Sequence, residues 1–215
     1  MGTSTNKFLN RFTTLPFLMD MLQRKYLTLL NPDSWDDKND TVTLKRYLKE
    51  KNKKSIYVLC LTDKRETIHH WNAFANDTSG CCIEFDSQKL LNTITNNDSV
   101  VKHGKVEYIR LNKLSPVKNS IEKLPFFKRD PFQAENEYRI IVVCDEEQKL
   151  TLDIPIELDV IKKITISKKL PDSVFESVKQ VLETIDSTLK GKINHSTLFD
   201  NPKWRNHFEN NNNQK

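Results

Sequence analysis

Glycine and cysteine are both scarce in this chain of 215 residues, which has four of each. So little glycine, together with only eight prolines, excludes the collagen-like and low-complexity classes. The cysteines, Cys60, Cys81, Cys82 and Cys144, lie in apolar, strand-like runs and show no C-x-x-C spacing. This pattern favours buried thiols over a zinc site or the disulfide framework of a small secreted protein, so we expect no metal.

Long apolar runs are also missing. No stretch approaches the roughly 18 consecutive apolar residues that a membrane-spanning helix needs. The N-terminus lacks the basic and then apolar pattern of a signal peptide. We therefore expect a cytoplasmic protein without a membrane partner.

The charge is only mildly basic, since 34 Lys and Arg against 29 Asp and Glu give a net charge of +5. Much of the excess lies in residues 45–54, KRYLKEKNKK. Tyr47 is the one aromatic residue of this run, which therefore lacks the interleaved aromatic residues that stack on successive bases. It indicates a solvated helix or loop, with contact to nucleic acid as the alternative interpretation.

The hydrophobic periodicity predicts one α+β domain over residues 7–205, with a mixed or antiparallel sheet of short strands and packing helices. Residues 1–6 are expected to be disordered, and residues 206–215 to form a flexible tail. Helices are expected near 17–22, 41–51, 66–76, 89–94 and 172–185. Strands are expected at 7–13, 26–30, 55–62, 80–86, 106–109, 150–154 and 161–167, and at the end of 130–143.

Residues 130–143, DPFQAENEYRIIVV, form the most informative stretch because they predict a loop that leads into a strand. Alternation along a strand places Glu135, Glu137 and Arg139 on one side. Two carboxylates on one strand face repel each other unless a cation or a reacting partner compensates them. Either Arg139 pairs with Glu137 in a surface ladder, or the strand forms the floor of a polar cleft.

Several motifs occur together in one order along the chain: LTLLNPDSWDD, CLT, HWNAF, GCCIEFD, VEY and ENEYR. Their order resembles the bacterial family catalogued as domain of unknown function two-nine-seven-one, over about residues 8–166. Trp71 and Phe74 match its W-x-x-aromatic motif, although Phe74 stands where a tyrosine is usual and Thr62 where a serine is usual. The resemblance implies a fold and, by association, an accessory protein of bacteria with a role in phage defence or a toxin-like role.

The chain is more distantly similar to mono-ADP-ribosyltransferases of the Arg-Ser-Glu type, since Arg11, Thr62 and the Glu135-Asn136-Glu137 triplet fall in their order. This resemblance implies NAD as a substrate and a protein or nucleic acid as acceptor. It implies that Glu137 stabilises the oxocarbenium-like state and that Glu135 orients the acceptor.

The same resemblance assigns binding roles to further residues. Arg11 would hold phosphate, and Trp71 or Phe74 would line the nicotinamide pocket. Thr62 supplies the one hydroxyl of the CLT motif, and Arg139 lies on the binding face of the strand that carries Glu137.

Two other classes remain open from sequence. One is a nucleotide- or protein-binding module without catalysis, in which Glu137 and Arg139 simply bridge. The other is a metal-dependent hydrolase or nuclease, which needs Asp36, Asp37 and Glu137 to converge around a divalent ion.

Overall fold

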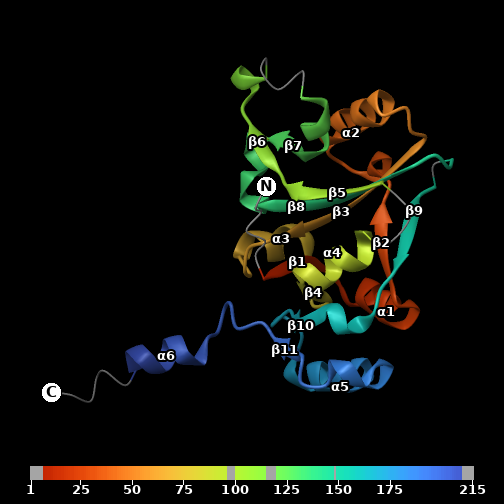
Figure 1. The fold of residues 1–215 in the computed structure, drawn as a ribbon. Helices are drawn as coiled ribbons and strands as arrows, with labels where there is room; N and C mark the ends of the chain where they lie inside the picture. Colours follow the sequence, from red (N-terminus) through yellow and green to blue (C-terminus); the bar gives the residue numbers. More distant parts are fainter. Residues whose placement is uncertain (1–6, 96–99, 115–119, 148, 210–215) are drawn as a thin grey trace.

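A nine-stranded, mostly antiparallel sheet organises the structure (Figure 1). The computed structural model describes residues 7–95, 100–114, 120–147 and 149–209. The strands of the large sheet are β1 (Phe8–Thr14), β2 (Tyr26–Leu30), β3 (Ser55–Thr62), β4 (Gly80–Asp86), β5 (Val100–Lys105), β8 (Glu137–Cys144), β9 (Thr151–Pro155), β10 (Ile161–Ile166) and β11 (Ile193–His195).

Helices and a separate two-stranded sheet surround this large sheet. The α-helices are α1 (Leu15–Arg24), α2 (Lys38–Glu50), α3 (Ile68–Phe74), α4 (Ser87–Thr95), α5 (Asp172–Ile185) and α6 (Pro202–Glu209). The small parallel sheet pairs β6 (Glu107–Ile109) with β7 (Phe127–Arg129). Short 3-10 helices flank β7, namely η4 (Ile121–Phe126) and η5 (Asp130–Glu135).

Strand β3 is the junction of the large sheet. Strand β8 pairs with it along its whole length, from Ser55 opposite Cys144 to Thr62 opposite Glu137. A strand has only two edges, so β1 and β2 share the other edge of β3, β1 at Thr62 and β2 at Val58. The sheet therefore divides at β3, and the ends of β1, β3 and β8 meet at one place.

The two faces of the sheet carry different layers because side chains alternate along each strand. Alternate residues of β3 and β8 pack with α1, α4 and α5 in the main hydrophobic core. The remaining residues face α2 in a second cluster, which includes Leu44, Tyr47, Val58 and Ile141. Helix α3 packs through Trp71 in a third cluster over β1 and β4. The place where β1, β3 and β8 meet thus lies between α2 and α3.

The predicted fold class, a single α+β domain with a mixed sheet of short strands, is confirmed. Helix α5 has the predicted bounds, as do β2 and β3. The predicted disordered residues 1–6 lie outside the described part of the chain, as do residues 210–215 of the predicted tail. Residues 206–209 belong to α6 instead.

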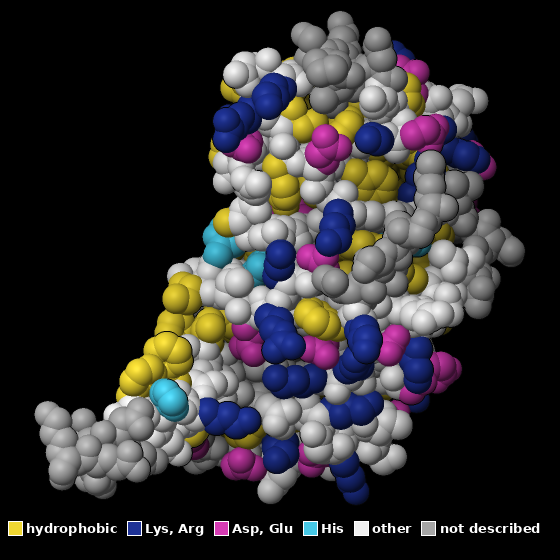
Figure 2. Space-filling view, turned by 60° about the vertical axis from the view of Figure 1, so that its left-hand side comes forward, with side chains coloured by type: hydrophobic (Ala, Val, Ile, Leu, Met, Phe, Trp, Pro, Cys, Tyr) yellow, Lys and Arg dark blue, Asp and Glu magenta, His cyan; other side chains and the backbone are white. Residues whose placement is uncertain are grey.

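Helix α6 projects from the body of the molecule (Figure 1). Figure 2 shows hydrophobic side chains gathered on this projection. Its large apolar residues are mostly exposed, with 69% of Trp204, 57% of Phe208 and 63% of the neighbouring Phe199 accessible. None of these three side chains belongs to a hydrophobic cluster of the described residues.

Gly80, at the start of β4, provides a test of how closely α3 is held against the sheet. A Cβ atom on Gly80 would lie 2.1 Å from the carbonyl oxygen of Ala75, a backbone atom that directly follows α3. We expect Gly80→Ala to lower the free energy of unfolding by about 1–3 kcal/mol, because the backbone must move. The matched control is Gly104→Ala on β5, where the new Cβ would meet the Phe126 ring at an ordinary 3.5 Å. Equal urea midpoints for the two variants would contradict this expectation.

Candidate functional site

Three neighbouring strands place Asn10, Thr62 and Glu137 in one row. Asn10 on β1 lies opposite Thr62 on β3, and Thr62 lies opposite Glu137 on β8. Residues directly opposite each other share a face of the sheet. The Thr62 hydroxyl donates to the Asn136 carbonyl oxygen at 2.9 Å, and the Asn10 side-chain amide donates to the Lys64 carbonyl oxygen at 2.8 Å. These bonds fix the strand ends around the row.

The loop before β8 turns sharply at Asn136, which has φ 44° and ψ 50°. Asparagine is one of the few residues that adopt this left-handed conformation readily. Glu135 therefore ends η5 and is not part of the strand. The prediction that Glu135, Glu137 and Arg139 share one strand face is right for Glu137 and Arg139 and wrong for Glu135.

Arg139 lies at the centre of a buried ion network and has no exposed surface. Its Nε donates to Glu137 at 2.6 Å. One terminal nitrogen donates to Asp40 at 2.8 Å and to the Pro125 carbonyl oxygen at 2.9 Å. The other terminal nitrogen donates to Glu137 at 2.9 Å and also to Asp40. A guanidinium has five N–H groups, and these contacts use all of them. Arg139 thus has no donor left for a ligand, and the interpretation of Arg139 as a substrate-binding residue is corrected.

Glu137 is the buried carboxylate that joins this network to a cavity. Burial alone would raise its pKa, but the charges and hydrogen bonds of Arg139 and Lys128 outweigh burial and lower it to about 2. The backbone of Glu137 is held as well, because its N–H meets the Tyr108 hydroxyl oxygen at 2.8 Å and its carbonyl oxygen accepts from Val106 at 2.9 Å. Glu137 is therefore a rigid, fully ionised group at neutral pH.

Lys128 on β7 bridges the carboxylates at the edge of the network. Its ammonium lies 2.6 Å from Glu135, 3.3 Å from Glu137 and 3.8 Å from Asp40. Burial raises the pKa of Glu135 in spite of Lys128, whereas the pKa of Lys128 itself is raised because its carboxylate neighbours outweigh burial. With all groups ionised, three carboxylates against Lys128 and Arg139 leave one net negative charge.

His70 connects α3 to the loop that carries Glu135. One ring nitrogen, Nε2, lies 2.8 Å from the Glu135 carbonyl oxygen, and Nδ1 lies 2.7 Å from the Thr67 hydroxyl. A carbonyl oxygen only accepts, so Nε2 carries the proton and Nδ1 accepts from Thr67. Burial lowers the pKa of His70, so the ring is neutral at pH 7.

Aromatic rings line the side of α3 that faces β1. Phe12 stacks on His70 with ring centroids 5.0 Å apart and an interplanar angle of 11°. Phe74 continues the row, with its centroid 6.4 Å from that of His70. Phe74 is 45% exposed, so this aromatic wall is accessible.

A cavity of about 140 Å³ opens between these groups. Four predicted site residues line it, namely Thr62, Phe74, Glu135 and Glu137. The other lining residues are Asn10, Phe12, Cys60, Leu61, His70 and Lys128. The structure thus combines the aromatic wall and the carboxylate cluster in one small site, which we call the ring cavity.

Arg11 does not reach the ring cavity. It lies opposite Ile83 on β4, which packs in the main hydrophobic core, so its side chain is directed to the other face of the sheet. Burial lowers the pKa of Arg11. Asn10, one residue earlier, occupies the position in the cavity that we expected for Arg11.

Trp71 does not line the ring cavity either. It is buried with Ala75 and Cys82, and its indole nitrogen donates to Glu66 at 3.1 Å. Its ring packs edge-on behind Phe12, at 5.5 Å between centroids, so it supports the aromatic wall from outside the cavity.

Cys60 lines the ring cavity and is exposed there, so the prediction of a buried thiol is wrong for Cys60. Solvent reaches its side chain through the ring cavity, and its neighbour is Glu137. The surrounding protein atoms displace part of the water around the thiol and, together with the charge of Glu137, raise its pKa well above its ordinary value. The thiol is therefore neutral at pH 7 and a poor nucleophile.

Sequence reasoning missed Asp40, Lys128 and the cavity role of Asn10, Phe12 and His70. Asp40 and Lys128 lie 99 and 11 residues before Arg139 and look like ordinary surface charges in a chain with 29% charged residues. The W-x-x-aromatic motif did mark the right helix. His70 lies one residue before it, and only the fold shows that this side chain turns towards the cavity.

The metal-site alternative placed Asp36, Asp37 and Glu137 around one ion. In the structure Asp37 instead caps α2 by accepting from the Asn39 N–H at 3.0 Å. Within the described ranges no group of three His, Cys, Asp or Glu side chains could hold a metal ion. The acidic residue of α2 that approaches Glu137 is Asp40, and Arg139 lies between them.

The fold and the site define an α+β protein with a small, aromatic-walled cavity above a buried ion network. Residues 70–140 match the family model described as "Protein of unknown function (DUF2971)", which agrees with part of the resemblance stated above. The matched region begins at His70 and includes Lys128, Glu135, Glu137 and Arg139. No curated protein and no solved structure matches the chain, and the likeness to mono-ADP-ribosyltransferases receives no support. No helix in the described part of the chain is long and apolar enough to cross a membrane.

Proposed function

We propose that the ring cavity binds the planar heteroaromatic ring of a nucleotide, and that this nucleotide is NAD. The observation that carries the proposal is the meeting of an accessible aromatic wall with a carboxylate cluster of net charge −1. The nicotinamide ring of NAD is planar and positively charged. It can stack on Phe74 and the neighbouring rings while the carboxylates of Glu135 and Glu137 face its charge.

The size of the ring cavity limits what it can hold. Its volume of about 140 Å³ lies below the roughly 300–1,000 Å³ of sites that enclose drug-sized ligands. This volume has room for one ring, so the sugar and phosphate groups of the nucleotide would remain at the mouth of the cavity. Lys64 and Arg65 are exposed and follow two and three residues after Thr62, so we expect them to supply positive charge for the phosphates.

A second candidate function is cleavage of the bond between nicotinamide and ribose. It is favoured by the ionised carboxylate of Glu137, which lies on the cavity wall opposite Thr62. In this step the C1′–N bond breaks, and nicotinamide leaves with the electron pair. Water or an acceptor then attacks the oxocarbenium carbon and loses a proton, while Glu137 stabilises the positive charge.

The contacts of Glu137 support binding more directly than catalysis. Both of its carboxylate oxygens accept from Arg139, and Lys128 approaches one of them. Arg139 therefore neutralises much of the charge that would stabilise an oxocarbenium ion. A module that binds NAD without cleaving it is consistent with the same geometry.

We expect NAD at millimolar concentration to raise the thermal unfolding midpoint of the protein, because it binds only the folded state. Phe74→Ala removes the exposed end of the aromatic wall, so binding should weaken about tenfold. The matched control is Phe17→Ala on α1, whose ring is 68% exposed and does not line the cavity. Differential scanning fluorimetry measures all three proteins.

An equal midpoint shift in Phe74→Ala and in wild type would contradict binding at this cavity. The same samples report on cleavage when free nicotinamide is measured by chromatography. A protein that is stabilised by NAD but releases no nicotinamide has the binding function alone.

A further inference from the structure

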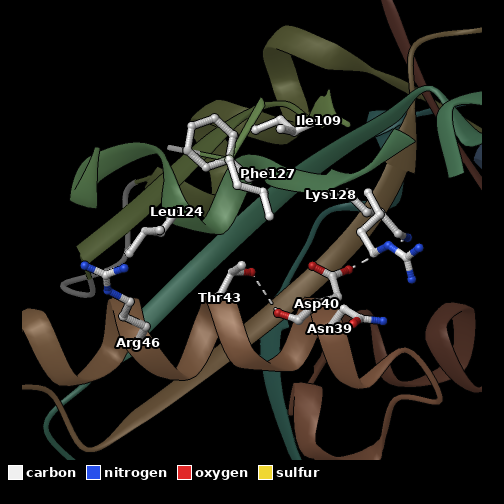
Figure 3. A pocket seen from close by; sticks show the side chains of 10 residues that line it. Asn39, Asp40, Thr43, Arg46, Ile109, Leu124, Phe127 and Lys128 are labelled. Atoms are coloured by element: carbon white, nitrogen blue, oxygen red, sulfur yellow. Dashed lines mark hydrogen bonds and ion pairs between the residues drawn. The ribbon is translucent and has the colours of Figure 1, made fainter. Parts of the chain in front are cut away.

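A second and larger cavity lies on the other side of the ion network. Its volume is about 350 Å³, within the usual range for sites that bind small molecules. It opens between α2 and the small sheet of β6 and β7. Figure 3 shows Thr43 and Asp40 on α2 facing Leu124 and Phe127, with Arg46 towards one end and Lys128 towards the other. We call it the α2 cavity.

The wall of the cavity that faces α2 is apolar. Ile109, Leu124 and Phe127 contribute side chains from β6, η4 and β7. Leu124 and Phe127 also belong to the second hydrophobic cluster, so this wall is fixed by packing. It offers a rigid surface to the apolar body of a ligand.

Basic side chains outnumber acidic ones among the described residues that line the α2 cavity. Asp40 is the acidic side chain of its lining, and Arg139 already neutralises it with two donors. Lys128 is engaged by carboxylates, whereas the Nε of Arg46 lies 3.9 Å from the exposed Glu50, a long ion pair. The Nε of Arg129 is buried and has no hydrogen-bond partner in the described part of the chain.

A buried guanidinium nitrogen without a partner carries a desolvation cost that a ligand can remove. Arg129 follows Phe127 at the spacing that places both side chains on the same face of β7, and both line the cavity. A carboxylate on the ligand would pair with Arg129 while the body of the ligand covers Phe127. Acidic side chains that would repel such an anion are absent from the described lining, apart from the neutralised Asp40.

We propose that the α2 cavity is a binding site for a small organic carboxylate with an apolar body, held at its charged end by Arg129. This site shares the lining residue Lys128 with the ring cavity, but it does not depend on the function proposed there. The two cavities differ in the charged residues that line them, since Glu135 and Glu137 line the ring cavity, whereas Arg46 and Arg129 line the α2 cavity.

Octanoate is a suitable probe because it combines one carboxylate with an apolar chain. Isothermal titration calorimetry should show saturable binding of octanoate to the full chain. Acetate lacks the apolar chain and octanol lacks the charge, so each should bind at least tenfold more weakly. Arg129→Met keeps an unbranched side chain and removes the charged guanidinium, and it should weaken octanoate binding at least tenfold.

The matched control is Arg110→Met. Arg110 is a neighbouring arginine with a 70% exposed side chain that pairs with Asp130 and does not line the cavity. Octanoate should bind this variant within twofold of wild type. No saturable binding of octanoate, or equal loss of affinity in both arginine variants, would overturn the proposal. Binding that Arg129→Met leaves unchanged would also overturn it, because it would place octanoate on another apolar surface such as α6.

Discussion

Replacing Arg139 by methionine should lower the free energy of unfolding by about 3–5 kcal/mol. The substitution leaves the carboxylates of Glu137 and Asp40 buried without their cation, and both side chains are 4% exposed or less. A loss of this size removes a large fraction of the roughly 5–15 kcal/mol that stabilises an ordinary domain. Urea denaturation followed by circular dichroism measures it.

The pH dependence gives this prediction a second readout. Without Arg139 the pKa values of the two carboxyl groups rise above their unfolded values, so the folded variant binds more protons than the unfolded chain. Its stability relative to wild type should therefore recover as the pH falls from 7 to 5. The control is Arg24→Met, which removes the partner of Asp20 and Asp153 at the surface and should cost under about 1 kcal/mol. Similar losses in both variants would show that the network contributes no more than a surface pair.

Replacing Glu137 by glutamine should have two separable effects. The pKa of Glu137 is about 2 in the folded protein against an ordinary value of 4.5, and this difference corresponds to about 3 kcal/mol of stability at pH 7. Because the folded pKa is the lower one, the contribution is complete above the unfolded pKa and is lost as the pH falls towards 2. The stability difference between wild type and Glu137→Gln should thus shrink by about 1 kcal/mol between pH 6 and pH 3.5.

The second effect of Glu137→Gln concerns catalysis. If the protein cleaves NAD, nicotinamide release should fall about 100- to 1,000-fold, as expected when a charge that stabilises the transition state is removed. Assays below the unfolding midpoint separate this loss from the loss of stability. Glu147→Gln is the control, since the Glu147 side chain is 89% exposed and pairs loosely with Lys54. A Glu137→Gln variant that keeps full stability and full turnover would refute both roles.

Local signals predicted most of the fold. Helix α5 repeats apolar residues at helical spacing, so its bounds could be read from the sequence. Strands β7 and β11 have only three residues each, and β5 reads VVKHGK, so none of them shows a pattern that distinguishes it from a loop. These strands form because β8, β6 and β10 offer edges for pairing, which is a tertiary effect.

Only part of the candidate site could be predicted, again because local patterns do not show which strands pair. Glu137 and Arg139 share a face because alternation within one strand is a local property. Thr62 meets Glu137 only through the register of β3 with β8, which no local pattern of the sequence reveals. Arg11 and Asn10 differ by one residue along β1, and a shift of one residue exchanges the two faces of a strand. Sequence alone could therefore place the strand at the site but not choose the side chain that enters it.

Lys128 lines both cavities, so ligands bound at the two proposed sites would share one side chain. Its ammonium lies between Glu135, on the side of the ring cavity, and Asp40, on the side of the α2 cavity. A ligand that draws this ammonium towards one side changes the electrostatic potential on the other. Linkage is reciprocal, so the factor by which an occupant of one site alters affinity at the second must equal the factor in the reverse direction. If both proposed ligands bind, this one side chain couples their affinities.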